Sequence, residues 1–104
     1  MQLIPIQQHS GFIEVNVSNI IRIEGQNTYS KIYFTNRPPL LVSKILKWFE
    51  DTLVENGFVR VHKSHLVNGA FICRQPRANL IRLQNGEVVP VSRRLKHINY
   101  AQAV

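Results

Sequence analysis

Cysteine and acidic residues are both scarce in this chain of 104 residues, and each shortage excludes a class of protein. Cys73 is the single cysteine, so no disulfide can form within the chain, and a lone thiol fits the reducing cytoplasm. No apolar run is long enough to cross a bilayer, and the first residues lack the basic start and apolar stretch of a signal peptide. We therefore expect a cytoplasmic protein that does not enter a membrane.

The shortage of acidic residues leaves a large positive charge, and this charge is concentrated in one part of the chain. There are 13 Lys and Arg against 6 Asp and Glu, for a net charge of +7. Residues 60–97 carry eight basic groups and one acidic group, whereas the charges cancel over the rest of the chain. Such a segment indicates a polyanionic partner, because each phosphate that is neutralised releases counterions.

Sequence signals for metal binding and catalysis are also lacking. His62 and His65 are three residues apart, but no cysteine or acidic residue stands at ligand spacing from them. A nucleophile pair of Ser64 and His62 would lack an orienting acid in the same motif, and there is no glycine-rich phosphate loop. We expect no enzymatic activity, no metal and no cofactor.

The spacing of apolar residues predicts a mostly β fold built from hairpins. Apolar and polar residues alternate in short segments bounded by turn residues, as in half-buried strands. The expected strands cover residues 12–17, 20–24, 28–34, 40–42, 69–72, 79–83 and 88–91. The strongest hairpin signal is Asn85-Gly86, which favours a type I′ turn, and another turn is expected at 25–27.

One main α-helix is predicted at about residues 43–56, where apolar residues recur on a single helical face. Ser43 is the expected N-cap of this helix and Gly57 its expected terminator. A short C-terminal helix is expected at 93–99, after Ser92. We expect residues 12–104 to form one domain, and residues 1–11 to be either an edge strand or the remnant of a linker.

The first stretch that could contact nucleic acid runs from Arg60 to Ser64. Lys63 can donate to guanine, His62 can donate from a ring nitrogen, and Ser64 can bond a phosphate. The alternatives are structural. His62 could equally brace the loop from its inner side, Arg60 could pair with an acidic residue, and Asn68 could hold the loop by bonding to nearby backbone.

The second stretch runs from Ser92 to Lys96. Arginine reads guanine with two hydrogen bonds and can also clamp a phosphate. Two adjacent arginines in a strand or helix start cannot face the same way. We therefore expect one of Arg93 and Arg94 to read a base and the other to contact a phosphate or an acidic neighbour, with Lys96 beside them.

These stretches resemble the signature of the LytTR family of bacterial DNA-binding domains. That family typically shows Arg-x-His-x-Ser-x-x-Val-Asn after a helix, then an Asn-Gly hairpin, then Val-Ser-Arg-Arg; here they fall at 60–68, 85–86 and 91–94. An Ile-x-x-Ile-Glu-Ala segment followed by tyrosine is matched at 20–29, with glycine in place of alanine and threonine in place of a usual asparagine. The resemblance covers residues 12–99.

The resemblance implies that the arginine at Arg93 reads a base and that the turn at 26–31 is a second DNA-contacting element. Tyr29 is expected in the core, and the short Ser30 side chain, near a family base contact, predicts an altered sequence preference. The expected DNA contacts are Asn27, Ser30, Lys31, His62, Lys63, Ser64, Arg93, Arg94 and Lys96.

The function that the resemblance implies is sequence-specific binding of double-stranded DNA by a bacterial transcription regulator, through loops of a β scaffold. Such domains are usually the output half of a two-component response regulator and bind paired repeat sites. A receiver domain would then lie outside these residues, and a weak or DNA-assisted dimer is expected. The alternative is a protein-interaction module whose basic face docks an acidic partner. An RNA-binding sheet is less favoured, because its exposed aromatic pair is not evident.

Overall fold

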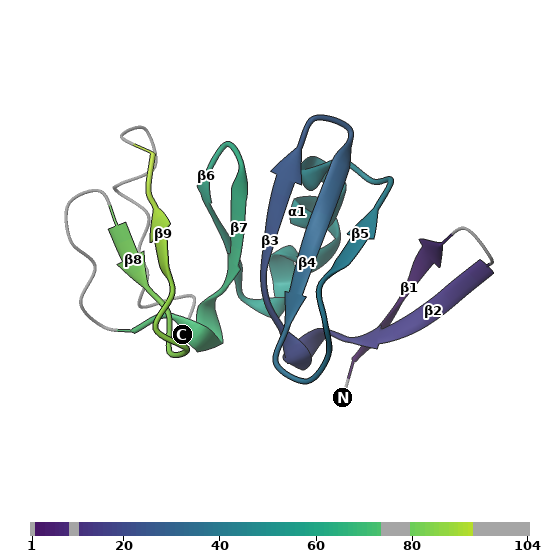
Figure 1. Ribbon diagram of the computed structural model, residues 1–104, viewed down its shortest axis with the longest axis horizontal. Helices are drawn as coiled ribbons and strands as arrows, with labels where there is room; N and C mark the ends of the chain where they lie inside the picture. The colour runs from purple at the N-terminus through teal and green to yellow at the C-terminus, as the bar shows by residue number, and fades with distance from the viewer. Residues whose placement is uncertain (1, 9–10, 74–79, 93–104) are drawn as a thin grey trace.

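Three β-sheets and one α-helix make up the part of the chain that the structure describes (Figure 1). The structure is a computed structural model, and it describes residues 2–8, 11–73 and 80–92. The strands are β1 (Leu3–Gln8), β2 (Gly11–Asn16), β3 (Ile20–Gln26), β4 (Tyr29–Phe34), β5 (Leu40–Val42), β6 (Phe58–His62), β7 (His65–Asn68), β8 (Leu80–Arg82) and β9 (Val88–Pro90). The helix α1 spans Leu46–Leu53, and 3-10 turns lie at Val17–Asn19, Val54–Asn56 and Gly69–Phe71.

The central sheet has the strand order β5-β4-β3-β7-β6, and every pair of neighbours is antiparallel. Tight turns join β3 to β4 and β6 to β7, where Gln26 faces Tyr29 and His62 faces His65. Because β3 also pairs with β7, these two turns lie at the same end of the sheet, as Figure 1 shows. The connection from β4 to β5 lies at the opposite end.

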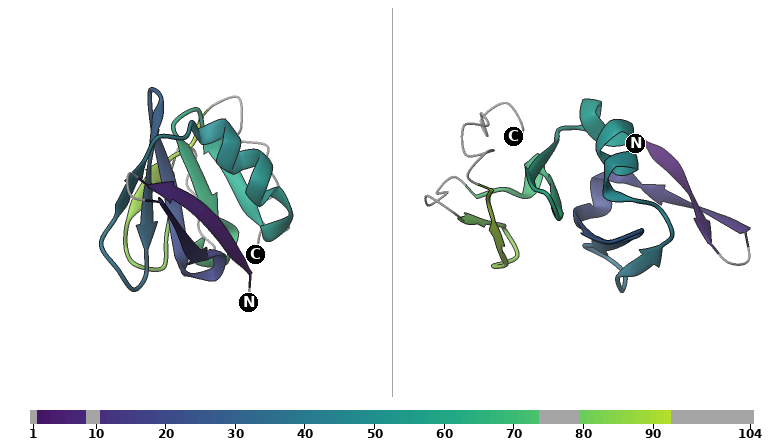
Figure 2. Two further views of the ribbon diagram at one scale, coloured as in Figure 1. Left: turned by 90° about the vertical axis from the view of Figure 1, so that its right-hand side faces the viewer. Right: turned by 90° about the horizontal axis from the view of Figure 1, so that it is seen from above.

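The main hydrophobic core lies between α1 and one face of the central sheet (Figure 2). Leu46, Phe49 and Leu53 are buried on the sheet-facing side of the helix, and Ile23 and Ile32 are buried beneath them. Burial of each such side chain stabilises the fold by about 1.5–3 kcal/mol. The turns at the end of the sheet are therefore attached to a tightly packed core.

A second core holds the β8–β9 hairpin next to β6 and β7. Ile81 and Val89 on the hairpin are buried together with Val61 and Val67 on the central sheet. The β1–β2 hairpin joins the main core instead, through Ile4 and other buried residues. Residues 3–8, for which an edge strand and a linker were both open, form β1 in that hairpin.

The main α-helix is confirmed, but it begins later than expected. α1 starts after Ile45, which forms no side-chain capping hydrogen bond, so the prediction of Ser43 as the N-cap is wrong. The predicted terminator is confirmed, since Gly57 has φ 80°, a conformation that glycine adopts without a Cβ clash. No helix in the described ranges is long and apolar enough to span a bilayer.

The prediction of a strand at 69–72 is wrong, because residues 69–71 form a 3-10 turn. Asn68 explains the difference: its Oδ1 accepts from Ala70 N at 3.0 Å, and its Nδ2 donates to Ile20 O at 2.9 Å. A side chain that bonds the local backbone in this way competes with strand pairing. This arrangement agrees with the structural alternative for Asn68.

The hairpin predicted at Asn85-Gly86 is confirmed, but its turn is not of type I′. Gly86 has φ 92°, whereas Asn85 is not among the described residues with positive φ. Gly86 N donates to Leu83 O at 2.9 Å, and Leu83 N donates to Glu87 O at 2.8 Å. This is the three-residue hairpin in which glycine forms a bulge after a type I turn. The C-terminal helix expected at 93–99 lies outside the described residues.

Candidate nucleic-acid interface

A backbone hydrogen bond links the last part of β3 to the β6–β7 turn at one end of the central sheet. Gly25 N, near the end of β3, donates to Ser64 O in the β6–β7 turn at 2.9 Å. Glu24 and His65 face each other in the register of β3 and β7. Residues from two of the predicted DNA-contacting stretches are thereby brought to the same end of the sheet.

The β6–β7 turn presents Lys63 at its tip, where the side chain is exposed. Ser64 N donates to Nδ1 of His62 at 3.1 Å, so His62 braces the turn. A neutral imidazole that accepts at Nδ1 keeps its other ring nitrogen as a donor. Bracing the turn and donating to DNA are therefore compatible roles for His62.

Arg60 is engaged within the protein, as in the structural alternative for this residue. Its Nε donates to His62 O at 2.8 Å, and its Nη2 donates to Lys63 O. Its Nη1 lies 2.8 Å from Oε1 of Glu50 on α1. All three guanidinium nitrogens thus have partners on the turn or on the helix behind it.

His65 lies beside His62, with ring centroids 5.3 Å apart. Burial lowers the pKa of His65 and outweighs the opposite effect of Glu24, while His62 and Arg22 lower this pKa further. His65 is therefore neutral at neutral pH. Its Nδ1 is buried without a hydrogen-bond partner among the described residues, and no group of three or more potential metal ligands occurs among them.

The β3–β4 turn consists of Asn27 and Thr28, because β3 continues through Gln26 and the turn expected at 25–27 is displaced. Asn27 has φ 58°, a left-handed conformation that asparagine tolerates well, and its side chain is exposed. Lys31 is half-buried, with Nζ 5.3 Å from the centre of the Tyr33 ring. Asn27 is thus the most accessible of the predicted contacts on this turn.

Side chains alternate between the two faces of β4, and this alternation overturns two expectations. Ser30 is fully buried, and its hydroxyl donates to Lys44 O at 2.6 Å. Contrary to expectation, the Ser30 side chain is therefore not available to DNA. Tyr29 was expected in the core, but 47% of its surface is exposed. Tyr29 stands next to the turn, where it is the accessible aromatic residue.

Lys44 is a basic residue at this end of the sheet, although it was expected on the helix at 43–56 and not among the DNA contacts. It belongs to the segment between β5 and α1, and the Ser30 hydroxyl holds its backbone close to the β3–β4 turn. Its Nζ lies 5.2 Å from the centre of the Trp48 ring.

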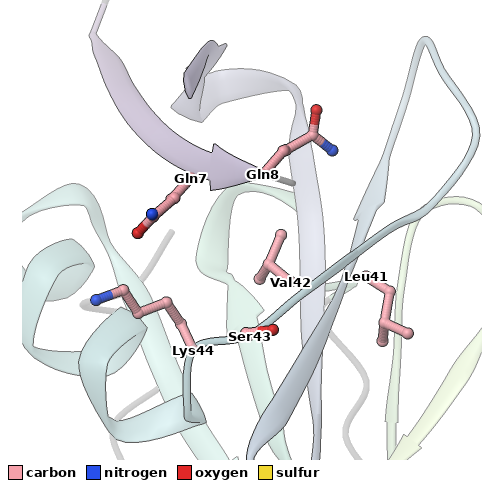
Figure 3. A pocket seen from close by; sticks show the side chains of 6 residues that line it. All are labelled: Gln7, Gln8, Leu41, Val42, Ser43 and Lys44. Carbon is pink, nitrogen blue, oxygen red and sulfur yellow. The ribbon is translucent and has the colours of Figure 1, made fainter. Parts of the chain in front are cut away.

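Lys44 also lines a groove of 440 Å³ between β1 and β5, shown in Figure 3; the other lining residues are Gln7, Gln8, Leu41, Val42 and Ser43. This groove contains amide, hydroxyl and ammonium donors but no carboxylate.

The third predicted stretch begins next to the β6–β7 turn. Ser92 N donates to Val61 O at 2.7 Å, which places Ser92 beside the last residues of β6. Arg93 follows Ser92 directly in the chain, but Arg93, Arg94 and Lys96 lie outside the described residues. The described part of the chain therefore locates the start of this basic run and not its side chains.

An ion cluster lies on the face of the central sheet opposite α1. Arg22 of β3 donates to Glu24 at 3.1 Å, and its guanidinium stacks 3.7 Å from the Tyr33 ring centre. Burial would raise the pKa of Glu24, but hydrogen bonds from Arg22 and Gln26 lower it below its ordinary value. Glu24 is therefore ionised and neutralised from within the protein, which limits its repulsion of an anionic partner.

Comparisons with known proteins bear on the family and the fold of this chain. The family model described as LytTr DNA-binding domain matches residues 10–98. One solved structure that resembles this chain is the LytTr DNA-binding domain of a Bacillus cereus protein described as a methyl-accepting/DNA response regulator. It is 24% identical, with 91% of this chain and 90% of that chain covered and a TM-score of 0.71, so it supports the fold. The comparison with curated proteins found no match.

Proposed function

Because this chain belongs to the LytTr family of DNA-binding domains, we propose that it reads specific sequences in double-stranded DNA through the turns at one end of its central sheet. DNA binding as part of a transcription regulator follows from the family. The sequence specificity and the contact residues are our proposal. A domain of this kind is a binding module rather than an enzyme.

The observation that carries this proposal is the hydrogen bond from Gly25 N to Ser64 O. It ties the Lys63 turn to β3, two residues before Asn27, and the bond from Ser92 N to Val61 O adds the start of the C-terminal basic run. Donors from two separate stretches, and the start of a third, thus lie at one end of the sheet. The opposite end lacks such a convergence within the described residues.

We assign the contacts by exposure and chemistry. Lys63, exposed at a turn tip, reads a base edge, while His62 and Ser64 donate at its sides. Asn27 on the neighbouring turn and Lys31 on β4 contact the DNA backbone or a base edge. Proposed contacts from the C-terminal run are a base-reading Arg93 and phosphate-bound Arg94 and Lys96.

We further propose that residues 12–104 act as the cytoplasmic output domain of a bacterial two-component response regulator, with a receiver domain outside this sequence. Two copies would bind paired repeat sites as a weak or DNA-assisted dimer. The support is the family membership and the size of the charged segment. Binding of two copies would be visible as two successive shifts on a duplex that carries both repeats.

Selection of bound sequences from random duplex DNA tests the proposed function. The selected duplex should compete for binding far better than a scrambled duplex of equal length and charge. Equal competition by both duplexes would reject sequence-specific reading. Displacement of both duplexes by an acidic protein, without any sequence preference, would favour the alternative of a protein-interaction module with a basic face.

A further inference from the structure

We propose that Arg60 is a positioning residue for the Lys63 turn: it holds the turn in the shape that reads DNA and does not contact DNA itself. The inference rests on the proposed function, since it assigns a role to a residue behind the same surface. Arg60 lies on β6 and reaches forward to the turn and back to Glu50 on α1.

The guanidinium group of Arg60 is occupied by three partners. Its Nε and Nη2 donate to the consecutive carbonyl oxygens of His62 and Lys63, and its Nη1 donates to the Glu50 carboxylate at 2.8 Å. The Arg60 side chain is 23% exposed and that of Glu50 is 32% exposed. A planar fork with several fixed donors can make these contacts together, whereas the compact ammonium of lysine cannot.

These contacts fix the backbone on both sides of the residue that is proposed to read a base. Arg60 holds the carbonyl groups of residues 62 and 63, and Gly25 N holds that of Ser64 from the other side. A turn held in this way loses less conformational freedom when it binds. Base discrimination also requires the reading side chain to be placed within about 0.5 Å, which depends on such supporting contacts.

The test compares Arg60→Lys and Glu50→Gln with a matched control, Asp51→Asn. Asp51 is the next carboxylate on α1, but its partner is Lys47 at 3.1 Å and not the turn. For each variant, affinity is measured for the selected duplex and for a scrambled duplex over a range of salt concentrations, together with the unfolding temperature.

Arg60→Lys should lower the ratio of specific to scrambled affinity about tenfold, because it keeps the charge and loses the fork. Scrambled-duplex affinity and the salt dependence should stay within about twofold of the original, as expected for a residue that contacts no phosphate. Glu50→Gln should lower the same ratio to a smaller extent, and Asp51→Asn should leave it unchanged.

Three results would overturn the proposal. An equal loss of affinity for both duplexes, with a shallower salt dependence, would show that Arg60 contacts a phosphate. A lower unfolding temperature with an unchanged affinity ratio would make its role purely structural. An unchanged ratio in both Arg60→Lys and Glu50→Gln would show that the fork does not matter. Failure of the proposed function is seen separately, as an absence of discrimination in the unmodified chain.

Discussion

The Arg22 guanidinium in β3 holds the Glu87 carboxylate of the β8–β9 hairpin at two points, from Nε to Oε1 at 3.3 Å and from Nη2 to Oε2 at 3.0 Å. The two residues are 65 positions apart, so the contact links the central sheet to the hairpin. The hairpin leads through β9 to Ser92. The ion pair therefore helps to set the place from which the C-terminal basic run begins.

Glu87→Gln should destabilise the fold by up to about 1 kcal/mol, because the pair is charge-assisted but partly exposed to solvent. The measurement is urea unfolding at neutral pH. Glu14→Gln, a change of the same kind at an exposed position on β2, is the control and should have little effect. Equal effects of the two substitutions would show that the contact with Arg22 contributes nothing specific.

The stabilisation from Glu87 should also depend on pH. The hydrogen bond from Arg22 lowers the pKa of Glu87 below its ordinary value of 4.5, against a smaller opposing effect of burial. The folded state therefore favours the ionised form. Its contribution to stability is present above pH 4.5 and is lost as the pH falls through the lower folded pKa. The stability difference between the original chain and Glu87→Gln should shrink over that range, and a constant difference would contradict the assignment.

Lys63→Ala should weaken binding to the selected duplex by about 1–3 kcal/mol and relax the preference at one base pair. The reason is the exposed position of Lys63 between two braced carbonyl groups. The measurement is a titration against the selected duplex and its single-base variants. If selected and scrambled duplexes lose affinity equally, Lys63 contacts only phosphate.

The salt dependence of binding should be steep. If about five basic groups meet phosphates, the slope of log K against log salt is about −4 to −5. Lys44→Gln should make the slope shallower by about 1, because Lys44 lies beside the β3–β4 turn. Arg37→Gln, which removes a charge from the connection at the opposite end of the sheet, should leave the slope unchanged. Equal changes for both would contradict the proposed surface.

The strand period explains why Ser30 is buried and Tyr29 is exposed. Ile32 and Phe34 are buried, so the same face of β4 includes Ser30, while Tyr29 takes the other face. Successive side chains of a strand alternate between faces. The sequence contains this alternation, whereas the expectations for Tyr29 and Ser30 followed from their positions in the family motif.

Other features could not be predicted from local patterns. The periodicity located α1, and Asn85-Gly86 located a hairpin, because these signals are short-range. The contact of Arg60 with Glu50 depends on how α1 lies across β6, and no spacing rule links residues of a helix and a strand. The 3-10 turn after Asn68 likewise depends on a hydrogen bond to Ile20 in a distant part of the chain.

Arg93→Ala should reduce base discrimination more than Arg94→Ala does. Arg93 follows Ser92, whose backbone is held to Val61, and a held backbone lowers the ordering cost of a two-point guanine contact. Each variant is measured against the selected duplex and its single-base variants. Arg93→Ala should flatten the preference at one base pair, and Arg94→Ala should lower all affinities together. The reverse pattern would mean that the two roles are exchanged.

The most direct test of the shared surface is an NMR titration of the chain with the selected duplex, following backbone amide shifts. The amides of Asn27, Lys63 and Ser92 should shift together at one stoichiometry, while that of Arg37 at the opposite end of the sheet should not move. A titration in which Arg37 shifts and the amides of Asn27 and Lys63 stay in place would contradict the account.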